Sequence, residues 1–100
     1  MTISLTTPAE VKTRLAAGEE VVLLDVREQS EVDEWSYPTA IHIPLGELEA
    51  RVGELPTGVG IICACRSGGR SMKAAVFLDT LGFVVTNLEG GQLAWAEGND

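Results

Sequence analysis

The chain has 100 residues, of which 45% are apolar and 22% charged, and it carries a formal net charge of −8. These values predict one globular domain, residues 1–100, with enough apolar surface for a core without disulfide or metal staples. The negative charge argues against nucleic acid and against an anionic membrane as partners. No apolar run reaches membrane-spanning length, and the first residues, MTISLTTPAE, lack the features of a signal peptide.

The chain begins with a strand pattern followed by a helix pattern. Residues 3–5 alternate apolar and polar side chains, which predicts a short edge strand. Thr7 and Pro8 then suit the N-cap and the first position of a helix that Gly18 would end. The expected apolar stripe of this helix consists of Val11, Leu15 and Ala16.

A buried strand is predicted over residues 21–26. The run is apolar except for Asp25, a composition typical of parallel strands that are covered on both faces. Asp25 and Arg27 stand at its carboxyl end, where open α/β sheets place their ligand sites. We expect these two side chains to support such a site by hydrogen bonds and ion pairing rather than to act chemically.

Three short elements follow this strand. Residues 30–35 suit an acidic helix with Ser30 as its N-cap, and residues 41–43 suit a strand that Pro44 stops. Residues 46–52 have helical spacing. The apolar residues expected on one face of this last helix are Leu45, Leu48 and Val52.

The clearest strand and helix patterns flank a glycine-rich loop. Residues 59–64 predict a strand, residues 71–81 predict a helix closed by Gly82, and the segment CRSGGRS occupies 65–71. A loop at a helix N-terminus points several backbone N–H groups at one spot and adds the positive end of the helix dipole. A thiol placed there, that of Cys65, should lose its proton easily, and an anion should bind over it.

The other loop residues suit supporting roles. Arg66 is expected to contact the anionic end of a substrate, and Arg70 to brace the loop while adding charge. Ser67 and Ser71 could donate hydrogen bonds, with helix capping as the alternative for Ser71. The glycines allow positive φ and the close approach of a ligand. The predicted loop that binds substrate and stabilises the thiolate comprises Arg66, Ser67, Gly68, Gly69, Arg70 and Ser71.

The last part of the chain adds a strand at 83–85, a turn at 90–91 and a short helix at 92–97. In that helix the residues expected to pack are Leu93 and Trp95. Strands that alternate with helices along a chain imply a parallel α/β sheet with right-handed crossovers.

The two cysteines of the chain are Cys63 and Cys65. Because a disulfide between them would be strained, we expect free thiols and a reducing, cytoplasmic location. Cys63 lies inside an apolar run and is expected to be structural. Together with the single histidine, His42, the cysteines are too few for a closed zinc site. We therefore expect no metal and no cofactor.

Four segments resemble the rhodanese-like (sulfurtransferase) domain. They are LLDVRE (23–28), AIHIPLGEL (40–48), the strand with CRSGGRS, and LEGGQLAWAEG (88–98), in the family's order and spacing. The resemblance implies a single-domain form with a central five-stranded, mostly parallel sheet flanked by helices on both faces. One turn departs from the family's GHIPGA, because Ser36 and Thr39 replace its His and second Gly. In the family these residues usually shape a turn away from the sulfur.

The resemblance also implies a reaction, that of a thiosulfate-type sulfurtransferase. The Cys65 thiolate would take the outer sulfur of a thiosulfate-like anion as a persulfide, and a thiol or cyanide would then accept it. The basic loop is of the kind that accompanies such donors in the family. His42 stands about where the family often has Asn, so we expect it to be structural rather than a base.

Two alternatives stay open. A sulfur-relay, carrier or binding module that acts with partner proteins would need the same persulfide on Cys65, and its sulfur acceptor would be a protein. A cysteine-dependent phosphatase also places a Cys…Arg loop over a helix N-terminus. The related phosphatase loop has one residue more than the four between Cys65 and Arg70. Because the tighter loop leaves less room for phosphate, sulfur transfer is favoured.

Overall fold

Five parallel strands form a central sheet in the computed structural model, which describes residues 3–97. The strands are β1 (Ser4–Thr6), β2 (Val21–Asp25), β3 (Ile41–His42), β4 (Gly60–Ala64) and β5 (Val84–Leu88). Their order is β1-β5-β4-β2-β3, and every neighbouring pair is parallel. The predicted parallel α/β sheet is therefore confirmed, with β1 at one edge and β4 in the centre.

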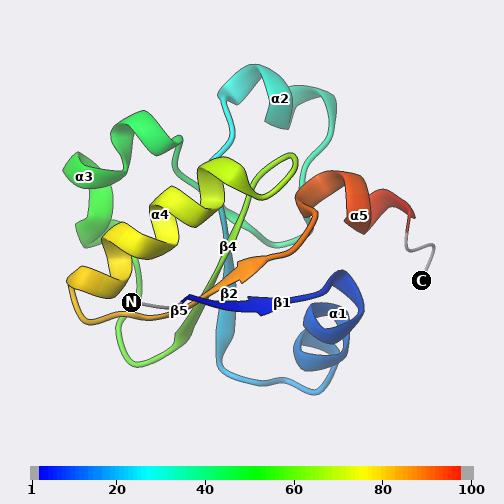
Figure 1. Cartoon of the computed structure of the whole chain (residues 1–100), viewed down its shortest axis with the longest axis horizontal. Coiled ribbons are helices and arrows are strands. Elements are labelled where there is room, and N and C mark those ends of the chain that lie inside the picture. The colour runs from blue at the N-terminus through cyan, green and yellow to red at the C-terminus, as the bar shows by residue number, and fades with distance from the viewer. Residues whose placement is uncertain (1–2, 98–100) are drawn as a thin grey trace.

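Helices cover both faces of this sheet (Figure 1). The helices are α1 (Pro8–Ala16), α2 (Gln29–Glu34), α3 (Leu48–Arg51), α4 (Gly69–Thr80) and α5 (Gly91–Glu97). α3 and α4 lie on one face, and α1 and α5 lie on the other. None of the helices within residues 3–97 is long and apolar enough to cross a membrane.

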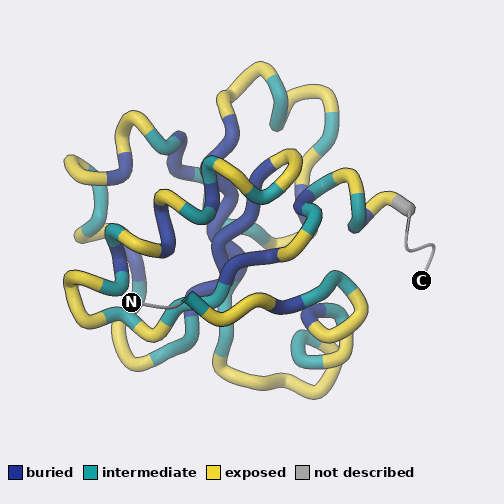
Figure 2. The backbone as a smooth tube through the Cα atoms, viewed as in Figure 1, coloured by how far each residue is buried: buried dark blue, intermediate teal, exposed yellow. Residues whose placement is uncertain are grey.

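The alternation of side chains along β4 divides the core into two parts. Ile61 and Cys63 pack with residues of α4, whereas Ile62 and Ala64 pack with residues of α1 and α5. This follows from the strand period, which turns successive side chains to opposite faces. Figure 2 shows the buried strands between more exposed helices. Each fully buried Leu or Ile contributes roughly 1.5–3 kcal/mol, so the central strands form a rigid base for the loops that follow them.

Of the N-caps predicted for α1 and α2, one is confirmed and one is wrong. Thr7 caps α1 as predicted, because its side chain accepts a hydrogen bond from the Glu10 N–H at 3.2 Å. The prediction of Ser30 as an N-cap is wrong, since α2 begins at Gln29. There the Glu31 carboxylate accepts a hydrogen bond from the backbone N–H of Glu28 at 2.9 Å, which satisfies a donor at the helix start.

Several other boundaries and faces differ from the expected ones. α4 begins at Gly69, two residues before the predicted start, with Gly68 at φ +110° as its N-cap. The expected helix over 46–52 is instead α3 between two 3₁₀ turns, Leu45–Glu47 and Val52–Glu54. Two residues expected to pack, Ala16 and Leu93, are exposed, whereas Trp95 is buried as predicted.

Candidate active site

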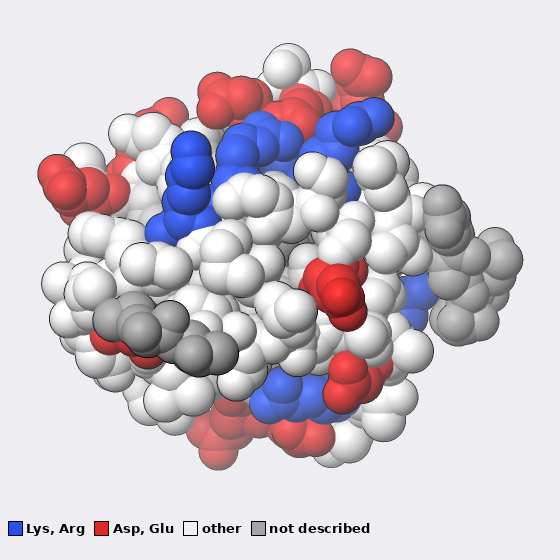
Figure 3. Space-filling view, in the orientation of Figure 1, with Lys and Arg blue, Asp and Glu red and all other residues white. Residues whose placement is uncertain are grey.

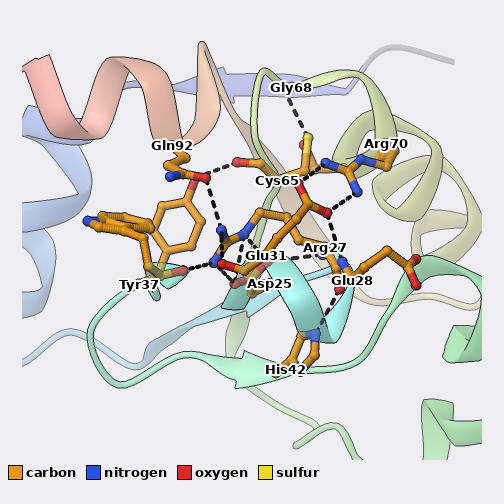
Figure 4. Close-up of polar contacts among 12 residues, drawn as sticks. Asp25, Arg27, Glu28, Glu31, Tyr37, His42, Cys65, Gly68, Arg70 and Gln92 are labelled. Carbon is orange, nitrogen blue, oxygen red and sulfur yellow. Dashed lines mark hydrogen bonds and ion pairs between the residues drawn. The ribbon is translucent and has the colours of Figure 1, made fainter. Parts of the chain in front are cut away.

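The carboxyl ends of the strands meet at one edge of the sheet, and the predicted site residues gather there (Figure 4). Cys65 follows the last residue of β4 and is 1% exposed. Asp25 ends β2 in register with Ala64, the last residue of β4, and Arg27 follows two residues later. The N-terminus of α4 closes the loop over the sulfur. Parallel topology alone therefore brings segments that are distant in sequence to one place.

The Cys65 sulfur lies within a cradle of hydrogen-bond donors. The Gly68 N–H donates to it at 3.0 Å and the Ser71 hydroxyl at 3.3 Å. Burial, the largest single influence, raises the pKa of the Cys65 thiol, but the hydrogen bonds from the Ser71 hydroxyl and from the loop amides together outweigh it. The net effect lowers the pKa of Cys65, so the loop favours a thiolate. Ser71 reaches the sulfur itself, and Gly68 occupies the N-cap.

The second cysteine has the opposite environment. Cys63 is fully buried between the sheet and α4, and burial is the main cause that raises its pKa to about 12. Both cysteines are free thiols. At neutral pH the two sulfurs are therefore chemically distinct, and only the Cys65 environment stabilises a thiolate.

Arg27 and Asp25 form a buried ion pair beneath the loop. Arg27 is 0% and Asp25 1% exposed, and Nη2 lies 2.7 Å from Oδ2. The same guanidinium donates to Gln92 Oε1 at 2.9 Å and to the Trp35 carbonyl at 2.8 Å. One side chain thus joins the end of β2 to α5 and to the segment that follows α2. The supporting role expected of the pair stays a prediction, and these are the contacts through which it would act.

The two loop arginines have different surroundings. Arg70 is paired with Glu31 of α2, and that hydrogen bond is the main cause that lowers the pKa of Glu31 to about 2. Arg66 is exposed and lines a hollow of about 170 Å³ with Glu31, Glu34 and Gln92. In Figure 3, basic side chains border acidic ones along the edge of the molecule where α2 and the start of α4 lie in Figure 1.

His42 does not contact the sulfur. Its Nε2 lies 2.7 Å from the Arg27 carbonyl oxygen, so the ring supports the backbone that follows β2. Among residues 3–97, no group of three His, Cys, Asp or Glu side chains is arranged to hold a metal ion.

The turn over residues 35–40 lies closer to the site than expected. Tyr37 is 3% exposed, and its hydroxyl reaches the backbone of Cys65 (Figure 4). Tyr37 of this turn therefore contacts the backbone of Cys65, although the turn was expected to lie away from the sulfur. Thr39, at the family's second glycine position, adopts a positive φ of 56°. Three further residues of the site, Glu31, Asn87 and Gln92, were not predicted, because contacts between side chains of distant elements leave no local pattern in the sequence.

Helix α5 docks on the loop through its first residue. A Cβ on Gly91 would lie 2.5 Å from the Cys65 carbonyl oxygen and 2.7 Å from the Arg66 carbonyl, and its φ is +53°. Position 91 therefore requires glycine, since any side chain would push α5 off the loop.

Comparison with known proteins identifies the family. The pattern of the rhodanese-like domain matches residues 7–98. The chain belongs to the rhodanese-like (sulfurtransferase) family. YtwF of Bacillus subtilis, named as a candidate sulfurtransferase, is 40% identical over 95 residues, which are 95% of this chain and 92% of YtwF. YrkF of Bacillus subtilis, named as a candidate sulfur carrier protein, is 39% identical over 84% of this chain and 46% of its own length.

A solved rhodanese structure agrees with the fold. The rhodanese-related protein of Thermoplasma volcanium superposes with a TM-score of 0.88 at 30% identity, and the match covers 97% of this chain and 93% of that protein. The five-stranded sheet with helices on both faces is therefore the rhodanese-like fold, as the sequence resemblance implied.

Proposed function

We propose that this rhodanese-like chain is a thiosulfate-type sulfurtransferase that carries sulfur as a persulfide on Cys65. The observation that carries the proposal is a thiol with a lowered pKa, held by N–H and O–H donors rather than by a histidine. The match over 92% of YtwF supports a protein that works as one rhodanese-like domain. Two free thiols in one chain support a reducing compartment, such as the cytoplasm.

The proposed reaction needs no proton transfer at the sulfur. The Cys65 thiolate attacks the outer sulfur of thiosulfate, the S–S bond of thiosulfate breaks, and sulfite leaves with the electron pair. Cyanide or a thiolate then attacks the outer sulfur of the persulfide, which forms thiocyanate or a new persulfide and releases the Cys65 thiolate. A site that stabilises a thiolate without a base suits this cycle, because each leaving group departs as an anion.

Arg66 is the proposed contact for the sulfonate end of the donor. Its side chain is exposed beside the loop, whereas Arg70 is engaged with Glu31. Arg66→Ala should therefore raise KM for thiosulfate more than it lowers kcat. A lost charge-assisted hydrogen bond is worth about 1.5–3 kcal/mol.

A second function, sulfur relay between proteins, is favoured by the charge at the entrance. Glu31 and Glu34 line the same hollow as Arg66, and acidic side chains there oppose the approach of a small dianion. The likeness to YrkF, named as a candidate sulfur carrier, supports the same reading. In this case the donor and acceptor would be partner proteins.

A phosphatase remains the third reading. With four residues between Cys65 and Arg70, the loop is shorter than in the related phosphatases. We expect no turnover of aryl phosphates and no tight inhibition by vanadate. Phosphate release that disappears in Cys65→Ser would reverse this ranking.

The deciding experiment is to trap the intermediate. The protein is incubated with thiosulfate, freed of excess reagent and weighed by mass spectrometry. We expect one added sulfur atom on the peptide that carries Cys65, lost on addition of cyanide or dithiothreitol. Cys65→Ser should not gain sulfur, and Cys63→Ala should gain it as the parent does. A folded protein that never gains sulfur would contradict the proposal. Fast thiosulfate:cyanide turnover would support a stand-alone enzyme, and trapping with poor turnover would support a relay.

A further inference from the structure

The carbonyl groups of the sulfur-binding loop are held from outside the loop. The Cys65 carbonyl accepts hydrogen bonds from the Tyr37 hydroxyl at 2.6 Å and from the Gln92 N–H at 2.8 Å. The Arg66 carbonyl accepts from the Leu93 N–H at 3.1 Å. The Gly68 carbonyl accepts from the side-chain NH₂ of Asn87 at 3.1 Å, as well as from the Met72 N–H within α4.

These contacts decide where the loop N–H groups point. In a trans peptide the C=O and N–H directions are opposed, so a carbonyl turned outward sends the N–H of the next residue inward. One of the three held peptide groups already shows this effect. The Arg66 carbonyl is bound by α5, and the Ser67 N–H of the same peptide contributes to lowering the pKa of Cys65. A held carbonyl also polarises its own peptide, which makes the N–H a stronger donor.

Tyr37 is built to hold such a carbonyl. Its ring packs edge-on against Trp35 and Trp95, with centroid distances of 4.9 and 5.4 Å, so the hydroxyl has little freedom. Burial raises the pKa of the phenol, which therefore stays a donor at every working pH. In the family turn GHIPGA the third position is Ile, which cannot donate a hydrogen bond. The contact between Tyr37 and Cys65 thus belongs to the altered turn of this chain.

Asn87 holds the other end of the loop, but one of its side-chain atoms is buried with no hydrogen-bond partner in the part of the chain that the structure describes. It stands on β5 in register with Cys63, is 3% exposed, and its Oδ1 has no hydrogen-bond partner among residues 3–97. A buried acceptor without a partner is unfavourable, so stability alone does not explain an amide at this position. The NH₂ group, however, binds the carbonyl of Gly68, whose own N–H donates to the Cys65 sulfur.

We propose that Tyr37 and Asn87 are positioning residues for sulfur transfer. From outside the loop they hold the carbonyls of Cys65 and Gly68 away from the sulfur. The peptides thus fixed carry the N–H groups of Arg66 and Gly69 and flank the segment whose Ser67 and Gly68 N–H groups act on Cys65. The inference rests on the proposed function, in which the outer sulfur of a persulfide carries the same negative charge. Gly68, at φ +110°, is the residue whose unusual conformation Asn87 fixes.

The test uses Tyr37→Phe and Asn87→Leu in the full chain. Each removes the donor: Tyr37→Phe keeps the ring, and Asn87→Leu keeps the branching of the side chain. Asn87→Leu also removes the unpaired acceptor. Thr80→Val is the matched control, because its hydroxyl also binds a carbonyl, that of Phe77, but at the opposite end of α4. The first readout is the pH dependence of Cys65 alkylation by iodoacetamide, which requires no sulfur transfer. The second is kcat and KM with thiosulfate and cyanide.

We expect the alkylation midpoint of each variant to rise by about half a pH unit to one unit, because a loop that is no longer held would align its N–H donors less well with the Cys65 sulfur. In thiosulfate turnover kcat should fall about threefold to tenfold with KM nearly constant, because the loop stabilises charge rather than binding the sulfonate. Asn87→Leu should lose reactivity without losing thermal stability, a combination that a purely structural residue would not give. Thr80→Val should match the parent in both readouts.

Parental midpoints and kcat in both folded variants would overturn the inference. Tyr37→Phe, which keeps the ring, decides the matter alone if Asn87→Leu does not fold. A parent protein that never forms a persulfide would remove the proposed function, whereas the alkylation midpoints would still show whether the two residues tune Cys65.

Discussion

The guanidinium of Arg70 and the carboxylate of Glu31 form a two-pronged ion pair, with Nη1–Oε1 at 2.6 Å and Nη2–Oε2 at 2.9 Å. The pair connects the start of α4 to α2 and partly neutralises one of the two positive charges beside Cys65. Such parallel hydrogen bonds fix orientation as well as charge. The loop is thereby braced, and Arg66 is left as the more available cation for an incoming anion.

Removal of the Glu31 charge should improve the binding of thiosulfate. In Glu31→Gln the carboxylate of residue 31 no longer offsets the charge of Arg70, and KM should fall about twofold to fivefold with kcat little changed, as expected for a partly exposed charge. The decrease should shrink at high salt, because screening weakens exposed charges. Glu49→Gln on α3 removes the same charge elsewhere on the surface. An equal fall in KM in that control would show an effect of net charge and not of Arg70.

The same pair should give a definite pH dependence of stability. The pKa of Glu31 falls from 4.5 to about 2 on folding, with the Arg70 hydrogen bond as the main cause. The folded state therefore gains stability that is complete above pH 4.5 and is lost as the pH falls through about 2. Because both side chains are partly exposed, we expect Glu31→Gln to cost about 0.2–1 kcal/mol at neutral pH.

Urea unfolding of the parent and Glu31→Gln measures this difference. The two unfolding free energies should differ at about pH 6 and converge toward about pH 2. If the difference in unfolding free energy stayed constant over this pH range, the charge of the Glu31 carboxylate would not be its cause.

Neutralising one partner of the buried pair of Asp25 and Arg27 should destabilise the protein far more than neutralising one partner of an exposed pair. Asp25→Asn keeps the shape of the side chain but leaves the Arg27 charge uncompensated in the interior, which should cost about 3–5 kcal/mol. Glu54→Gln, which weakens the exposed pair of Glu54 with Arg51, is the matched control and should cost much less, because solvent screens that pair. Urea unfolding at neutral pH compares them. Equal losses in the two variants would contradict the importance of burial.

Thr39 offers a stabilising substitution. A β-branched residue at φ +56° is strained by roughly 1–2 kcal/mol, whereas glycine accepts this conformation freely. Glycine also loses about 0.5–1 kcal/mol more backbone entropy on folding, so Thr39→Gly should gain about 0.5–1 kcal/mol overall. Gly58→Ala is the reverse experiment, since Gly58 has φ +80° and open space around it. The midpoint temperature of thermal unfolding should rise in Thr39→Gly and fall in Gly58→Ala.

The elements that could be predicted from the sequence are those whose structure is determined by residues of the same segment. The apolar run that forms β4, the glycines of the loop and the apolar spacing of α4 are all local, and they predict a thiol at a helix N-terminus. The strand run containing Asp25 is equally local, because burial on both faces leaves a continuous apolar pattern. The parallel sheet then follows from the alternation of these elements.

The features that could not be predicted depend on contacts with another residue or element. Ser30 is a good N-cap by itself, but reciprocal hydrogen bonding between Glu28 and Glu31 starts the helix earlier. Leu93 is apolar yet 43% exposed, because its backbone N–H and not its side chain is what α5 directs toward the loop. Tyr37 gave no signal at all, since its role depends on the Cys65 carbonyl, 28 positions further along the chain.

The sheet order has a consequence for how the protein is made. Ser4–Thr6 pair with Thr86–Leu88, so the first of these five strands to be synthesised has the last of them as its partner. At about 5–20 residues per second, β1 waits roughly 4–16 s before β5 emerges. β1 can therefore join the sheet only after the central strands β2 and β4 have been synthesised. During synthesis β1 stays unpaired, because the edge of β5 that it will cover does not yet exist.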